Sequence, residues 1–118
     1  MTKIKNKFDL EERTTNFGIA VVNFCQKLDK NFINNPLISQ VVRSSGSIGA
    51  NYREANDPLG KKDFLHKLRI SRREAKEALH WLELLEATVQ EEKPEIKTLK
   101  QEAKELTYIF TSIINKCE

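Results

Sequence analysis

The chain has few of the residues that interrupt helices or build tight turns. Its 118 residues include only four glycines and three prolines, too few for a sandwich or barrel with many turns. No apolar run approaches the roughly 18 residues of a membrane span. No apolar stretch long enough for a signal peptide follows the first lysines. We therefore expect a small soluble protein of the cytoplasm, without a membrane partner.

Recognisable catalytic and metal-binding patterns are also missing. Cys25 and Cys117 lack a CxxC partner and a histidine at metal-ligand spacing, so both are predicted to be free thiols. No glycine-rich phosphate loop is present. Glu77 and His80 match the ExxH spacing of di-metal bundles once, but such a site needs the motif on two helices, and the last segment has no histidine. We predict no enzyme activity, no cofactor and no metal.

Apolar residues recur every three or four positions in four segments, which is the period of a helix that buries one face. These segments lie at about 8–30, 36–56, 61–90 and 95–117, with short polar loops between them. Short loops place consecutive helices side by side, so we predict an all-α, antiparallel up-down-up-down four-helix bundle forming one domain over 1–118. The predicted core stripes are Leu10, Phe17, Val21, Phe24 and Leu28; Leu37, Val41, Ser44, Ile48, Tyr52 and Ala55; Phe64, Leu68, Ser71, Ala75, Ala78, Leu82, Leu85 and Val89; and Ile96, Leu99, Ala103, Leu106, Phe110, Ile113 and Cys117.

Small residues interrupt the middle of the second segment at 44–50. The apolar stripe keeps helical phase across them, so we expect a helix there. We further expect Gly46 and Gly49 to let this helix approach Ser71 and Ala75 of the third segment closely. At the start of the second helix, Asn35 is the predicted N-cap, followed by a proline that suits a first turn.

Basic residues are concentrated in the first half of the third segment. Residues 61–76 contain seven basic and two acidic side chains, whereas 81–118 contain eight acids and five lysines. Two interpretations stay open: a solvated face whose arginines pair with Glu74 and Glu77, or a surface for nucleic acid or an acidic partner. No aromatic residues alternate with the basic ones, so base stacking is not expected. The candidate nucleic-acid-binding residues are Lys61, Lys62, Lys67, Arg69, Arg72, Arg73 and Lys76.

Apolar side chains also occur off the predicted core stripes. A second apolar stripe on a bundle usually marks a partner surface. We therefore expect a closed homo-oligomer. The residues concerned are Ile19, Val22, Ile38, Ile70, Leu84, Ile109 and Ile114.

Two blocks of sequence resemble a known family. The first, within 40–55, contains Arg43-Ser44, Ser47-Ile48, Asn51 and Glu54-Ala55; the second, within 63–82, contains Phe64, Leu68, Ile70-Ser71, Glu74, Glu77 and Trp81-Leu82. Their pattern and long spacing resemble the bacterial four-helix-bundle family named after proteins encoded in intervening sequences of large-subunit ribosomal RNA genes. The resemblance covers essentially the whole chain.

The resemblance implies a bundle that assembles into a ring, commonly a pentamer, with no known catalytic residues. A distant relative, the accessory protein of diversity-generating retroelements, binds a reverse transcriptase and nucleic acid through a basic surface. We therefore expect a non-catalytic, ring-forming bundle that binds RNA, DNA or a nucleic-acid enzyme such as a reverse transcriptase. The alternative is a protein–protein interaction scaffold with no nucleic-acid role. The polar positions Arg43, Asn51 and Glu54 are then either hydrogen-bonding groups between helices or part of a binding site.

Overall fold

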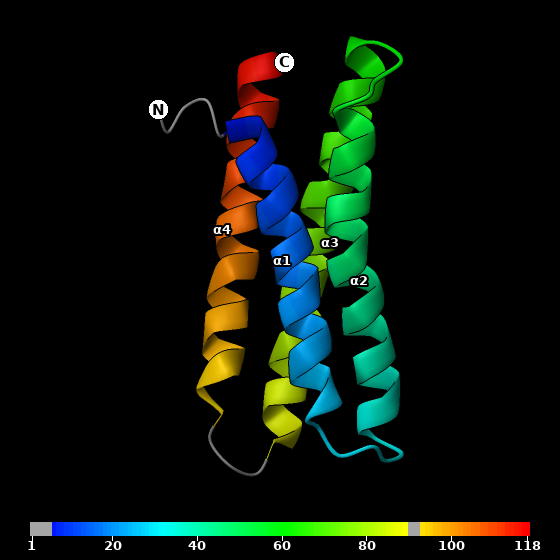
Figure 1. Cartoon of the computed structure of the whole chain (residues 1–118), viewed down its shortest axis with the longest axis vertical. Helices are drawn as coiled ribbons and strands as arrows, with labels where there is room; N and C mark the ends of the chain where they lie inside the picture. The colour runs from blue at the N-terminus through cyan, green and yellow to red at the C-terminus, as the bar shows by residue number, and fades with distance from the viewer. Residues whose placement is uncertain (1–5, 90–92) are drawn as a thin grey trace.

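The computed structural model describes residues 6–89 and 93–118, and these form four α-helices with no strand among them. The helices are α1 (Asn6–Gln26), α2 (Asn34–Ala55), α3 (Lys61–Thr88) and α4 (Pro94–Cys117). The chain reverses direction after each helix, with the α1–α2 loop at one end of the molecule and the α2–α3 loop at the other (Figure 1). The predicted four-helix bundle is confirmed. The predicted loop before Pro94 falls partly on 90–92, which lie outside the described residues.

Each helix packs against two neighbours within an elongated body of 45 × 29 × 19 Å. The contacts join α1 to α2, α2 to α3, α3 to α4 and α4 back to α1. In the described part of the chain α1 and α3 do not approach each other, so they occupy diagonal positions. This arrangement gives α3 an outward face on the side of the bundle opposite α1.

Most residues of the predicted apolar stripes are buried, but Leu37, Phe64, Val89, Ile113 and Cys117 are only half-buried. The clearest difference from the prediction is in α4. Ile113 was predicted to be buried and Ile114 to be exposed, but Ile114 is 1% exposed and Ile113 only half-buried. A strict seven-residue repeat drifts by about 20° per heptad on a straight helix. By the third repeat of α4 the next residue has therefore rotated into the core.

The small residues of α2 approach a different helix from the one predicted. A Cβ atom on Gly49 would lie 3.1 Å from Thr14 Oγ1 of α1, and one on Gly46 would meet nothing within 4 Å. The expectation that both glycines face α3 is therefore wrong, because they lie further round α2 than its α3-facing side. Ser71 does approach α2 closely, since its hydroxyl donates to the carbonyl of Ile48 at 3.0 Å.

The residue that caps the start of α2 lies four positions before the predicted Asn35. The side-chain oxygen of Asn31 accepts hydrogen bonds from the backbone N–H groups of Ile33 at 3.0 Å and Asn34 at 2.8 Å. These are the groups that an N-cap satisfies. The turn over 31–33 therefore leads into α2, which begins at Asn34, two residues before Pro36.

Candidate nucleic-acid interface

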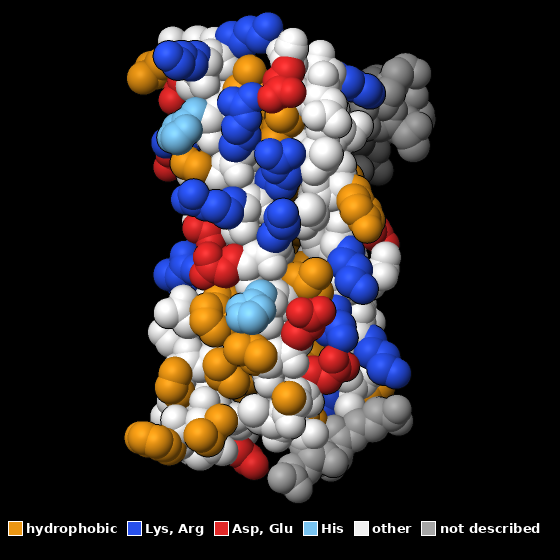
Figure 2. Space-filling model, turned by 180° about the vertical axis from the view of Figure 1, so that it is seen from behind, with side chains coloured by type: hydrophobic (Ala, Val, Ile, Leu, Met, Phe, Trp, Pro, Cys, Tyr) orange, Lys and Arg blue, Asp and Glu red, His pale blue; other side chains and the backbone are white. Residues whose placement is uncertain are grey.

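A stripe of basic residues and histidines runs along the outward face of α3. Lys62, His66, Arg69, Arg73, Lys76 and His80 follow one another at steps of four and three, and all six are exposed. At 1.5 Å per residue the stripe is about 27 Å long. We call these six residues the α3 stripe. The space-filling view shows Lys and Arg side chains gathered over one half of this face, with hydrophobic side chains gathered toward the other end (Figure 2).

The two acidic residues within the basic segment are directed away from the α3 stripe. Asp63 accepts a hydrogen bond from the backbone N–H of Leu59 at 3.2 Å. Glu74 accepts from Arg43 of α2 at 3.3 Å. Because both carboxylates are engaged on the α2 side, they do not neutralise the outward basic side chains.

The seven predicted binding residues fall into two groups. Lys67 pairs with Glu54 of α2 at 2.7 Å, and Arg69 pairs with Glu118 at the end of α4 at 2.5 Å. The hydrogen bond from Lys67 to Glu54 raises the pKa of that lysine. The other five make no hydrogen bond or ion pair with any residue in 6–89 or 93–118: Lys61, Lys62, Arg72, Arg73 and Lys76.

The expected pairing of the α3 arginines with Glu74 and Glu77 is replaced by a contact from α2. Arg43 binds both carboxylates, and Trp81 Nε1 donates to Glu77 Oε2 at 3.0 Å. The pKa of Glu77 is lowered, chiefly by the Trp81 hydrogen bond and then by the charge of Arg43, with a smaller contribution from Arg73. Glu77 therefore ties α2 to α3.

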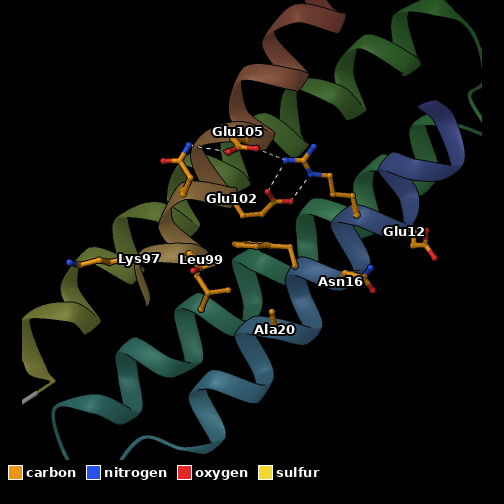
Figure 3. A pocket seen from close by; sticks show the side chains of 11 residues that line it. Glu12, Asn16, Ala20, Lys97, Leu99, Glu102 and Glu105 are labelled. Atoms are coloured by element: carbon orange, nitrogen blue, oxygen red, sulfur yellow. Dashed lines mark hydrogen bonds and ion pairs between the residues drawn. The ribbon is translucent and has the colours of Figure 1, made fainter. Parts of the chain in front are cut away.

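A groove of about 700 Å³ separates α1 from α4, and an ion cluster spans it (Figure 3). Arg13 donates to both carboxylate oxygens of Glu102, at 2.6 and 2.7 Å, and to Glu105 at 2.8 Å. These contacts raise the pKa of Arg13, with the Glu102 hydrogen bond as the largest cause. Among the described residues, no histidine, cysteine or serine lines the groove. We interpret the cluster as a clamp between two helices that contact each other sparingly.

The chain matches the family model of 23S rRNA-intervening sequence proteins over residues 6–112. It belongs to that family. It is also similar to a solved structure, a protein of unknown function from the S23 ribosomal protein family of Bacteroides thetaiotaomicron. The two share 32% sequence identity and a TM-score of 0.78, over 88% of this chain and 96% of that one. A comparison with curated proteins gave no match.

The polar positions through which the chain resembles the 23S rRNA-intervening sequence family make contacts within the bundle. Asn51 donates to the carbonyl and the hydroxyl of Ser47, at 2.9 and 3.0 Å, and Glu54 binds Lys67. With Arg43 bound to α3, the described residues supply a partner for each of these side chains. Of the two roles left open by the sequence, hydrogen bonding within and between helices is the one that these contacts support.

The ExxH pair does not form a metal site in the described residues. Glu77 is engaged by Arg43 and Trp81, and His80 packs edge-on against Trp81 with ring centroids 5.0 Å apart. No group of three or more potential ligands was found in the described ranges. None of the helices found there is long and apolar enough to cross a membrane.

Sequence reasoning missed the place of the histidines in the stripe. His66 and His80 occupy the same heptad positions as the basic residues, and that spacing was visible in the sequence. The segregation of Asp63 and Glu74 to the α2 side needed the structure, because it depends on which groups outside α3 they meet.

Proposed function

We propose that the chain is a non-catalytic helical bundle that binds RNA or DNA through the sugar–phosphate backbone. The observation that carries this proposal is the outward face of α3. Lys62, Arg69, Arg73 and Lys76 share this face, and the carboxylates of the same segment are directed elsewhere. Of these four cations only Arg69 is paired with a carboxylate, that of Glu118. Such a row of cations attracts phosphates mainly by releasing their counterions.

The binding we propose is weak for one copy and tolerant of sequence. The α3 stripe contains no Phe, Tyr or Trp side chain on which a base can stack. A helix that contacts phosphates alone has no means of distinguishing base pairs. The acidic surface of a nucleic-acid enzyme, such as a reverse transcriptase, is a second kind of partner that the same charges would attract.

Self-assembly is part of this proposal. We propose a closed homo-oligomer, with a ring of five copies favoured by family resemblance alone. Several copies would present several stripes to one nucleic-acid strand, and linked weak contacts produce avidity well above the affinity of each. The two free thiols suit a reducing compartment such as the cytoplasm.

The experiment is a salt titration of binding to fluorescent single-stranded RNA and double-stranded DNA. We expect Arg69→Gln, Arg72→Gln and Arg73→Gln together to weaken binding. They should also flatten the dependence of log affinity on log salt by about 0.7–0.9 for each phosphate that the variant no longer neutralises. The matched control replaces three exposed or half-exposed lysines of α4, Lys97, Lys100 and Lys104, by glutamine. It should leave the slope near that of the parent. Absence of binding by the parent at about 50 mM salt would refute the proposal.

A protein–protein scaffold is the second candidate function. The observation in its favour is that Arg69 already pairs with Glu118, so part of the basic face serves a contact between protein groups. In that case the triple variant would weaken self-association, and the parent would bind neither nucleic acid.

A further inference from the structure

The outward face of α3 changes from basic to apolar toward the C-terminal end of the helix. Beyond His80 the α3 stripe continues at the same spacing to Leu84 and Ala87, which are both exposed, Leu84 by 38%. Trp81 precedes Leu84 by three residues, so the two are neighbours on the helix surface, and it is half-buried. Figure 2 shows the change, with hydrophobic side chains toward one end of the face and Lys and Arg side chains over the other half.

The start of α2 extends this apolar surface. Arg43 of α2 binds Glu77 of α3 across the outer seam between the two helices. Pro36 precedes Arg43 by seven residues, and Leu84 follows Glu77 by seven. Each step is about two turns, and α2 and α3 are antiparallel, so both steps lead to the same end of the seam. Ile33 lies one turn before Pro36, and both are exposed, Ile33 by 60%.

The apolar patch, as we call this surface, consists of five residues: Ile33, Pro36, Trp81, Leu84 and Ala87. Its one polar side-chain atom is Trp81 Nε1, which donates to Glu77 Oε2 at 3.0 Å. Glu83 and Glu86, three residues apart, lie on the opposite flank of α3, where Glu86 pairs with Lys100 of α4. Several apolar side chains gathered on one surface mark a site for a partner, whereas a single one does not.

Nucleic acid does not complement the apolar patch. Ile33, Pro36 and Leu84 are aliphatic and offer no ring on which a base can stack. The ring of Trp81 is half-buried and already contacts His80 edge-on. Phosphates placed over these side chains would lose water without meeting a cation. A protein surface with bulky apolar side chains is the better match for this end of the face.

A second copy of this chain does not complement the whole face either. The partner has to bring acidic groups to the cations from Lys62 to Lys76 and apolar groups to the apolar patch. Among the described helices only α1 has more acidic than basic residues, by three to two, and basic residues outnumber acidic ones in the other three. The helices of a second copy would therefore bring cations to the α3 stripe.

We infer that an acidic amphipathic helix of another protein binds along the outward face of α3. Its carboxylates pair with Lys62, Arg73 and Lys76, which make no hydrogen bond or ion pair with any residue in 6–89 or 93–118. Its apolar side chains cover the apolar patch, as amphipathic helices do when they bind a groove. The inference goes beyond nucleic-acid binding. Since both partners need the α3 stripe, they exclude each other.

The two halves of the face set the length of the partner helix. From Lys62 to Lys76, α3 rises by about 21 Å, and from His80 to Ala87 by about 10 Å, at 1.5 Å per residue. A helix of about 20 residues covers both halves, with carboxylates over about four turns and apolar side chains over about two. The opposite charges speed association and fix the alignment, and the covered apolar surface adds affinity that salt does not screen.

The test uses fluorescent synthetic peptides of about 20 residues. One has glutamates every three or four residues over about four turns, followed by leucines at that spacing over about two turns. A second peptide has the reverse order, so that both directions along α3 are covered. A control peptide of the same composition alternates the glutamates and leucines. By fluorescence anisotropy, we expect one of the first two peptides to bind the parent about tenfold more tightly than the control, because only separated charges and apolar side chains match the two halves of the face.

Two serine variants test the apolar patch. Ile33→Ser and Leu84→Ser should each weaken peptide binding by about tenfold, because each removes one covered aliphatic side chain. Ile33 is 60% exposed, so its replacement should leave the fold intact, which circular dichroism checks. The control is Tyr108→Ser on α4, where the side chain is 70% exposed, and it should not change peptide binding. Neither Ile33→Ser nor Leu84→Ser should change the affinity for single-stranded RNA.

A double variant tests the shared cations. Arg73→Gln with Lys76→Gln should weaken the binding of both the peptide and RNA, and the peptide should displace RNA from the parent. Binding of the ordered peptides no tighter than that of the control would overturn the inference, and so would unchanged peptide affinity in both serine variants. An equal loss of RNA affinity in those variants would also overturn it, as would peptide and RNA bound together. A parent that binds the peptide but no RNA would support the inference and refute the proposed function.

Discussion

The two neighbouring glycines of α2 offer a direct measure of how closely α1 and α2 approach. In a helix, glycine is less favourable than alanine by about 1 kcal/mol. A Cβ atom at position 46 would meet nothing within 4 Å, so Gly46→Ala should raise the free energy of unfolding by about that amount. For a chain of this length the melting temperature should rise by about 4 °C.

Gly49→Ala should raise the free energy of unfolding much less than Gly46→Ala, or lower it. Its new Cβ atom would lie 3.1 Å from Thr14 Oγ1 and 3.4 Å from Thr14 Cβ, closer than ordinary contact. Thr14 is 1% exposed and its hydroxyl donates to the Glu11 carbonyl at 3.0 Å, so it has little room to move. Gly49→Leu should go further and cost about 1–3 kcal/mol through overpacking.

The assay is urea denaturation followed by circular dichroism, repeated at several protein concentrations so that any contribution from contacts between copies is detected. A double-mutant cycle with Thr14→Ala isolates the contact, because the deficit of Gly49→Ala should shrink once the Thr14 hydroxyl and methyl are removed. Equal stabilisation by Gly46→Ala and Gly49→Ala would refute the close approach of α1 and α2 at this point.

Two further predictions concern polar contacts. The lowered pKa of Glu77 contributes stability that is present above its unfolded pKa, about 4.3, and is lost as the pH falls through the folded value. Glu77→Gln should therefore flatten the decline of the unfolding free energy below about pH 4.5. The control Glu83→Gln should not flatten it. Parallel plots of unfolding free energy against pH for both variants and the parent would count against the contact between Glu77 and Arg43. Asn31→Ala should destabilise the protein by about 1 kcal/mol, measured by thermal melting, because two N–H groups at the start of α2 lose their acceptor; an unchanged melt would show that water replaces the cap at no cost.

The helical architecture was predictable because burial dictates a repeat that the sequence displays directly. Phe17, Val21 and Phe24 are buried where the spacing places them. The error at Ile113 and Ile114 arose from treating the repeat as strictly heptad, whereas seven residues of a straight helix fall about 20° short of two full turns. Which helix Gly49 faces could not be predicted from the sequence of α2 alone, since its neighbour Thr14 is on α1.

The candidate interface was predictable only in part. The excess of cations over residues 61–76 is a property of composition. Which of them remain unpaired depends on distant residues, as Glu54 binds Lys67 and Glu118 binds Arg69. Ile19 and Val22 were correctly expected to be exposed, but their position on the wall of a groove between α1 and α2 follows from how the two helices pack.

The contact between Arg43 and α3 has a consequence for how the chain selects one alignment of its helices. Because the apolar seam of α3 repeats every seven residues, α3 could slide by one repeat, about 10 Å, and still offer apolar side chains to α2. In the observed alignment Arg43 meets Glu74 and Glu77. A slip of seven residues would place it opposite Lys67 and Ile70 in one direction, or Trp81 and Leu84 in the other. Neither pair offers a carboxylate to the guanidinium, so a single arginine favours the native alignment over alternatives that apolar packing alone would permit.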